Sequence, residues 1–268
     1  MPRTRLLTAA VLLSLVLLLL SCGSAALVMG VFAAVALRAA WEWAGLCRGL
    51  AGARRWSLLA TLAATMLALR ELPDVVGAIA LAVALLWWAL ALWLVLRYPA
   101  VPGWLSAAPA QALIIVVAIV PAWLALSRLA AGHRGLLLLC LSLVWAADSA
   151  AYLVGRRLGR RKLCPQVSPG KTVEGLFSGL TAAALTGLVA GLTLRLDGAP
   201  LAALVGLTSA CAALSVVGDL AESLFKRRAG LKDSSQLLPG HGGVLDRIDA
   251  LLAAAPLFAL AAPLLVGG

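Results

Sequence analysis

Two carboxylates, a hydroxyl and an ammonium group follow one another at helical spacing in one short stretch of the sequence. Asp219, Glu222, Ser223 and Lys226 stand at positions i, i+3, i+4 and i+7, so a helix would carry all four on one face. The stretch before them is wholly apolar, which places Asp219 near a membrane surface. The pattern fits an amphipathic helix end with Asp–Lys pairing. It also fits a metal-binding face with a phosphate-binding lysine one turn later.

A second pair of carboxylates, Asp246 and Asp249, repeats this spacing near the start of the last apolar stretch. Such carboxylates can complement a helix N-terminus. If the two carboxylate faces meet, they form an all-oxygen site suited to Mg²⁺. The residues between them include a glycine-rich turn that could approach an anion closely, made of Gly240, His241, Gly242 and Gly243.

A further acidic residue, Asp148, interrupts an otherwise apolar stretch. There it either bonds another helix or faces an aqueous cavity. The basic loop 156–162 that follows is typical of a topological signal or of attraction to anionic lipid. Beyond it, Ser168 and Pro169 predict a helix start with N–H groups free for phosphate. The spacing of a Walker A loop is absent.

The composition excludes a water-soluble globule and a disordered chain. Of 268 residues, 63% are hydrophobic and 12% charged, and 22 Lys and Arg against 11 Asp and Glu give a net charge of +11. Two histidines exclude a multi-histidine metal site. The five cysteines have no CxxC pair and are interpreted as small apolar residues.

Charges and turns divide the chain into about nine apolar stretches, each near the length of a membrane-spanning helix. They run at about 6–21, 24–46, 56–70, 74–96, 110–127, 135–155, 174–194, 199–218 and 250–267. We therefore expect an all-α, polytopic integral membrane protein with cytoplasmic catalytic loops. It would form a single membrane domain, in which residues 1–134 are a scaffold and 135–268 carry the catalytic motifs. The N-terminus resembles a signal peptide, but an apolar stretch follows at once, and we expect it to remain as the first span.

The basic residues favour one orientation in the membrane. With nine spans, 17 Lys and Arg lie on the side of the N-terminus and only 4 on the other. This predicts a cytoplasmic N-terminus and a C-terminus on the opposite side. The long polar loops, about 156–173 and 219–249, would then lie in the cytoplasm.

The C-terminal half resembles the phosphatidate cytidylyltransferase (CDP-diglyceride synthase) family. The signature-like positions are Ser223, Phe225, Lys226, Arg227, Lys232, Asp233, Ser235, Leu238, Pro239, His241, Gly242, Gly243, Val244, Asp246, Arg247, Ile248 and Asp249. Similar positions occur earlier, at Asp148, Tyr152, Gly155, Arg156, Ser168, Pro169, Lys171, Thr172, Glu174 and Gly175, and Glu42 in Trp41-Glu42-Trp43 also fits. Gly170 departs from the pattern, because many members are expected to carry a second lysine there.

The resemblance implies that CTP and phosphatidate give CDP-diacylglycerol and pyrophosphate with Mg²⁺, and a second metal or a monovalent cation is left open. It implies that the catalytic residues are Asp219, Asp246, Lys226 and Lys171, and that the metal ligands are Asp219, Asp246, Asp148 and Asp249. Substrate-binding roles fall to Ser168, Lys171, Thr172, Ser223, Lys226, Arg227, Lys232, Gly240, His241, Gly242, Gly243 and Arg247.

The expected partners are CTP, phosphatidate and membrane lipids, without nucleic acid, and a homodimer is left open. The expected location is a bacterial-type inner or plasma membrane, with a funnel that opens sideways to lipid. Two alternatives are weighed against the transferase. One is a CTP-dependent lipid-alcohol kinase, and the other is a non-enzymatic transporter or anionic-lipid-binding membrane protein.

Overall fold

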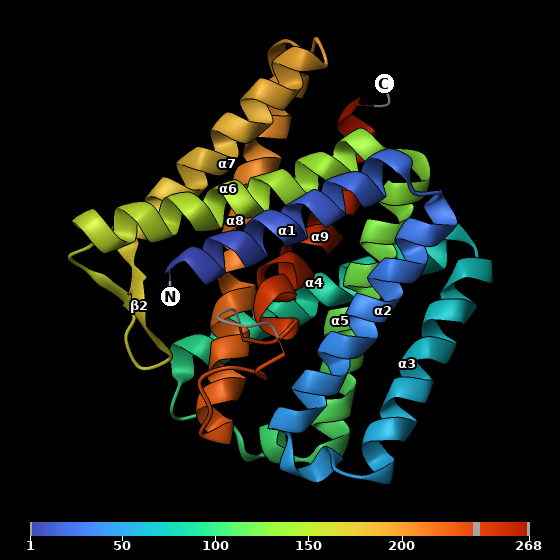
Figure 1. The fold of residues 1–268 in the computed structure, drawn as a ribbon, viewed down its shortest axis with the longest axis vertical. Coiled ribbons are helices and arrows are strands. Elements are labelled where there is room, and N and C mark those ends of the chain that lie inside the picture. Colours follow the sequence, from blue (N-terminus) through green and yellow to red (C-terminus); the bar gives the residue numbers. More distant parts are fainter. Residues whose placement is uncertain (1, 238–241, 267–268) are drawn as a thin grey trace.

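The computed structural model describes residues 2–237 and 242–266, and these residues form nine α-helices (Figure 1). The helices are α1 (Pro2–Cys22), α2 (Ala25–Leu46), α3 (Ala53–Glu71), α4 (Asp74–Arg97), α5 (Ala108–Gly132), α6 (Arg134–Leu158), α7 (Val173–Thr193), α8 (Gly198–Ala229) and α9 (Leu245–Val266). Two short 3₁₀ helices, η1 (Arg48–Leu50) and η2 (Gly103–Ser106), lie in the connections. Each of the nine predicted stretches is a helix, and seven of these helices, α2 and α4–α9, are long and apolar enough to cross a membrane.

Local signals in the sequence account for the helix boundaries. Ser24 caps α2 by accepting a hydrogen bond from Leu27 N, which confirms the predicted break between the first two stretches. Gly230 ends α8 in the left-handed conformation, with φ of 72°. These residues stop the helices without a Pro/Ser-rich linker.

The prediction that a helix begins at Pro169 was wrong. Ser168–Thr172 is a strand, β2, which pairs in antiparallel fashion with β1 (Lys162–Cys164). Helix α7 begins only at Val173, where Thr172 Oγ1 accepts a hydrogen bond from Gly175 N. The backbone of β2 is thus used in a hairpin, which Figure 1 shows projecting beyond the helices.

Small residues bring the catalytic-half helices close together. One buried stripe of α7 consists of Gly175, Gly179, Ala183, Gly187 and Gly191. A Cβ added at Gly179 would lie 3.0 Å from the carbonyl oxygen of Ala147 on α6, and one at Gly187 would overlap Thr208 on α8. Such small-residue contacts are how helices associate in lipid, where apolar burial gives little drive.

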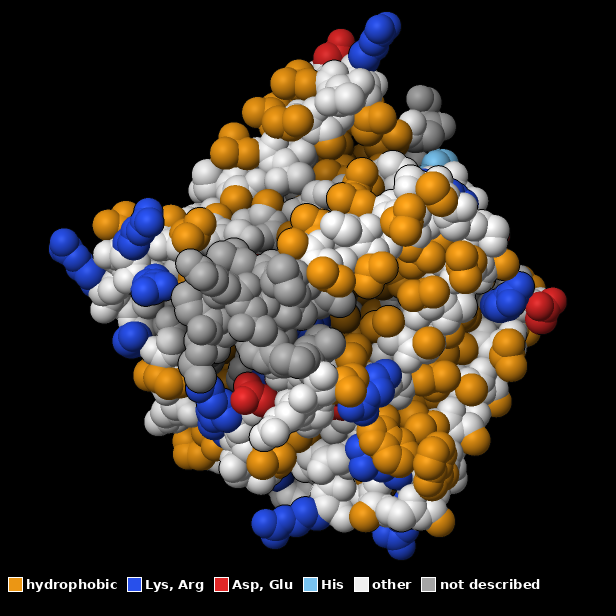
Figure 2. Space-filling view, viewed as in Figure 1, with side chains coloured by type: hydrophobic (Ala, Val, Ile, Leu, Met, Phe, Trp, Pro, Cys, Tyr) orange, Lys and Arg blue, Asp and Glu red, His pale blue; other side chains and the backbone are white. Residues whose placement is uncertain are grey.

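Large apolar side chains cover much of the outer surface. Among the most exposed are Leu86, Leu96, Leu264, Phe177 and Val189. Figure 2 shows hydrophobic side chains over the visible face, with Lys and Arg mostly along its left and lower margins. Exposed apolar surface of this extent is expected of a protein whose helices face lipid.

Side-chain contacts tie the connections together at two opposite ends of the bundle. At one end, Arg228 Nη2 donates to Ser106 Oγ at 2.5 Å and Arg227 Nε donates to Val167 O at 3.2 Å. At the other end, Arg134 donates to Leu20 O and Gly23 O at 3.1 and 2.7 Å. These contacts join the α1–α2 connection to the start of α6 at one end, and the end of α8 to the α4–α5 and α6–α7 connections at the other.

Candidate active site

The candidate site lies at the end of α8 that extends beyond its apolar part. The helix has 32 residues. At about 1.5 Å per residue it is roughly 48 Å long, more than the ~30 Å hydrocarbon core. About 20 residues from Gly198 cross that core, so the helix leaves it close to Asp219. Asp219, the partly exposed member of the four polar residues, thus stands where a lipid headgroup and a water-soluble molecule can both reach.

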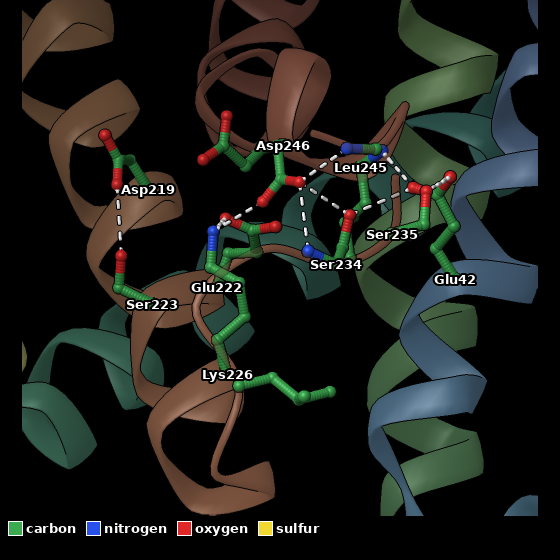
Figure 3. Close-up of polar contacts among 12 residues, drawn as sticks. Glu42, Asp219, Glu222, Ser223, Lys226, Ser234, Ser235, Leu245 and Asp246 are labelled. Atoms are coloured by element: carbon green, nitrogen blue, oxygen red, sulfur yellow. Dashed lines mark hydrogen bonds and ion pairs between the residues drawn. The ribbon is translucent and has the colours of Figure 1, made fainter. Parts of the chain in front are cut away.

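The first of two ion pairs joins the hairpin to α8. Lys171 Nζ, from β2, lies 2.6 Å from Asp219 Oδ2, and the two side chains are 22% and 34% exposed. Ser223 Oγ donates to Asp219 Oδ1 at 3.3 Å (Figure 3). Because both charged groups remain partly exposed, an incoming phosphate can compete with Asp219 for the lysine.

The second ion pair is buried. Lys226 Nζ lies 2.5 Å from Glu222 Oε2 and 2.6 Å from Asp246 Oδ1, so one ammonium bridges α8 and α9. The lysine side chain is 10% exposed, and the two carboxylates are 2% and 6% exposed. Within α8, Lys226 therefore pairs with Glu222. Asp219 pairs instead with Lys171, which lies on β2.

Asp246 is surrounded by donors. Its Oδ2 accepts from Gly243 N at 2.7 Å, Ser234 Oγ at 2.9 Å and Ser234 N at 3.0 Å. Its Oδ1 is held by Lys226. Both oxygens therefore have protein partners, and Asp246 fixes the end of the loop before α9.

Glu42 joins this cluster from α2, although it is remote in sequence. Glu42 Oε2 accepts from Leu245 N at 2.7 Å and from Ser234 Oγ at 3.0 Å, and Oε1 accepts from Ser235 Oγ at 2.7 Å. Figure 3 shows Ser234 between the carboxylates of Glu42 and Asp246. The sequence placed Glu222 on the candidate metal-binding face and Glu42 among the family-like positions, but it gave neither a role in the site and did not single out Ser234. The signal was present for Glu42, since an acidic residue in an apolar stretch is costly unless it has a use.

The oxygen ligands expected for Mg²⁺ are present in type but not gathered in one place. Within the described ranges, no three His, Cys, Asp or Glu side chains are close enough together to hold a metal ion. Glu222 Oε1 is buried, and it has no hydrogen-bond partner among the residues that the structure describes. Asp219 is partly exposed, whereas both oxygens of Asp246 have protein partners.

The other predicted site residues differ in their hydrogen-bond partners and in their exposure. Arg227 is committed to the carbonyls of Val167 and Leu231, at 3.2 and 3.3 Å. Lys232, Arg247 and Asp148 are exposed, and Ser168 is half-buried on β2. Gly242 has φ of 78°, which favours glycine, and a Cβ at Gly243 would overlap Ser234 and Glu42. Gly240 and His241 lie outside the described residues.

The chain is similar to known proteins over most of its length. The model of a family described as "Cytidylyltransferase family" matches residues 3–265. A phosphatidate cytidylyltransferase of Pseudomonas aeruginosa is 44% identical over 93% of this chain and 94% of its own length. Enzymes of the same name from Haemophilus influenzae and Brucella melitensis are 46% and 52% identical over 65% and 44% of this chain, and 65% and 43% of their own lengths.

Proposed function

The chain belongs to the cytidylyltransferase family, and we propose that it transfers the cytidylyl group of CTP to phosphatidate, forming CDP-diacylglycerol and pyrophosphate. The observation that carries this proposal is the pair of lysine–carboxylate contacts, Lys171–Asp219 and Lys226–Asp246, at the polar end of a membrane-spanning helix. The identity of the two substrates comes from the relatives, which are named phosphatidate cytidylyltransferase. Neither the lipid-alcohol kinase nor the non-enzymatic alternative is favoured, because the family match covers nearly the whole chain.

The chemistry requires little covalent participation from the protein. The phosphate oxygen of phosphatidate attacks the α-phosphorus of CTP, and the bond from that phosphorus to pyrophosphate breaks. Because the attacking oxygen is already anionic, no nucleophilic serine and no strong base is needed. The protein must hold two polyanions in line and offset their charge.

The residues divide this task. Lys171 is partly exposed and can exchange Asp219 for a phosphate oxygen, and the Ser223 hydroxyl lies beside it. Lys226 is buried between two carboxylates, so its role is to hold Asp246 and α9 rather than to meet a phosphate directly. The exposed cations Lys232 and Arg247 are free to attract the triphosphate.

A divalent cation, Mg²⁺ in our proposal, would be held by the partly exposed Asp219 together with phosphate oxygens of the substrates, and when bound it would neutralise phosphate charge. We expect purified protein to release pyrophosphate from CTP only when phosphatidate is present, and to stop when EDTA is added in excess. Restoring Mg²⁺ should restore the rate. Release that continues in EDTA would contradict the cofactor assignment, and release without phosphatidate would contradict the transfer.

We also propose a plasma-membrane protein whose site faces the cytoplasm, since CTP is made there and 17 of the 22 basic residues fall on that side.

Labelling of the cysteines tests this topology directly. Cys22 is exposed and Cys164 half-buried, whereas Cys47, Cys140 and Cys211 are buried. A membrane-impermeant maleimide should label the Cys164→Ser variant, through Cys22, in intact cells, and should label the Cys22→Ser variant only after lysis. The reverse pattern would invert the topology.

A further inference from the structure

Glu42 makes four polar contacts, three of them to residues of the loop before α9 and the start of α9. Its carboxylate accepts from Ser234 Oγ, Ser235 Oγ and Leu245 N at 2.7 to 3.0 Å. Its Oε1 also lies 3.1 Å from Arg38 Nη2. The residue is 2% exposed. A buried carboxylate with four donors is held in one position, and it holds them in return.

The contacts of Glu42 lie on both sides of the loop before α9. Ser234 and Ser235 precede the glycine-rich turn, and Leu245 is the first residue of α9. The next residue on α2, Trp43, packs edge-on against Phe225 of α8, with ring centroids 5.3 Å apart. Helix α2 is therefore anchored to the catalytic helix at the point where its carboxylate reaches the loop.

Ser234 connects Glu42 to Asp246. Its hydroxyl oxygen lies 3.0 Å from Glu42 Oε2 and 2.9 Å from Asp246 Oδ2. The hydroxyl has one proton, which it can donate to either carboxylate oxygen. The position of Ser234 therefore couples the positions of Glu42 and Asp246. Gly243 N also donates to Asp246 Oδ2, which brings the glycine-rich turn into the same network.

We propose that Glu42 is a positioning residue for CTP, acting through Ser234 and Leu245 to set Asp246 and the turn at Gly242–Gly243. This inference rests on the proposed function, since it assigns that turn to the triphosphate. It gives α2, in the half of the chain expected to be a scaffold, a direct part in the site.

The contacts require a carboxylate at this position. A glutamine offers one oxygen and one NH₂ group. With the NH₂ at the Oε2 position, it faces the Leu245 N–H, and with the NH₂ at the Oε1 position it faces the Arg38 guanidinium. Either orientation sets one donor against another, so Glu42→Gln loses at least one contact.

The test is a steady-state comparison of Glu42→Gln with the wild type. We expect the KM for CTP to rise about tenfold or more, the usual effect of losing a hydrogen bond to a charged group, while the KM for phosphatidate stays constant. Partial unfolding would lower the amount of active enzyme and would leave both KM values unchanged. Glu71→Gln, on an exposed residue of α3, serves as the control and should match the wild type.

Two further variants separate positioning from a general loss of packing. Ser234→Ala removes the hydroxyl that touches Asp246, whereas Ser235→Ala removes one that touches only Glu42 among the carboxylates. We expect the KM for CTP to rise more in Ser234→Ala. In Arg38→Met/Glu42→Gln the donor clash at Oε1 is gone, so part of the CTP affinity should return.

Normal KM values for CTP in both Glu42→Gln and Ser234→Ala would overturn the inference, as would a fall in kcat alone. If Glu42→Gln does not fold, the KM for CTP of Ser234→Ala is compared with that of Ser235→Ala, and equal values would overturn the inference. If the wild type forms no CDP-diacylglycerol, the proposed function fails, and loop geometry is tested without activity. Trypsin should then cleave after the exposed Lys232 faster in Glu42→Gln than in the wild type. Equal cleavage would exclude the positioning role.

Discussion

Replacing Asp219 by asparagine should lower the kcat for CDP-diacylglycerol formation by about 10²- to 10³-fold, the range seen when one electrostatic group of a site is removed. The carboxylate lies 2.6 Å from Lys171 Nζ and accepts a hydrogen bond from Ser223. An amide keeps the shape of the side chain and loses the charge that orients the lysine. The measurement is the initial rate at saturating CTP and phosphatidate over a range of Mg²⁺ concentrations.

Asp197→Asn is the matched control, because Asp197 stands at the other end of α8 and its side chain makes no capping bond. Its rate should equal that of the wild type. Wild-type turnover of Asp219→Asn at saturating Mg²⁺ would remove Asp219 from the catalytic residues. A defect that higher Mg²⁺ reduces would support its role as a ligand.

Replacing Lys226 by methionine should destabilise the protein by about 3–5 kcal/mol, the cost of leaving buried charge without its partner. Glu222 and Asp246 share this ammonium at 2.5 and 2.6 Å. Without it, two carboxylates at 2% and 6% exposure would face each other. The measurement is thermal or denaturant unfolding of the protein purified in detergent.

Two variants control this result. Lys232→Met changes the same residue type on an exposed loop and should leave the unfolding transition in place. Glu222→Gln/Lys226→Met removes one of the two stranded charges and should recover part of the loss. If Lys226→Met unfolds at the same point as the wild type, the buried pair has no structural role.

Most of the fold follows from the sequence because lipid imposes a simple rule. A helix that crosses the hydrocarbon core satisfies its own backbone hydrogen bonds, so apolar stretches bounded by charges and turns located the nine described helices. The i, i+3, i+4 and i+7 spacing likewise predicted the shared face of α8. The failure at Pro169 arose where this rule does not apply, because a loop in water can satisfy its backbone by pairing strands, as β1 and β2 do.

The partners of the site residues could not be predicted in the same way. Spacing within one helix says nothing about which lysine a carboxylate meets, and Asp219 meets Lys171 rather than Lys226. The contact of Ser234 with Glu42 spans 192 positions and depends on how α2 packs against α8. Asp246 is a predicted metal ligand, and the sequence did not show that its oxygens would meet Gly243 and Ser234 of the preceding loop and Lys226 of α8.

The most direct test of the account uses CTP labelled with ³²P at the α or the γ position. Purified protein given phosphatidate and Mg²⁺ should move the α label into the lipid fraction as CDP-diacylglycerol, while the γ label leaves as pyrophosphate. Transfer of the γ label to lipid would show a kinase and contradict the account. The absence of both labels from lipid would show that the chain does not transfer the cytidylyl group, and it would also contradict the account.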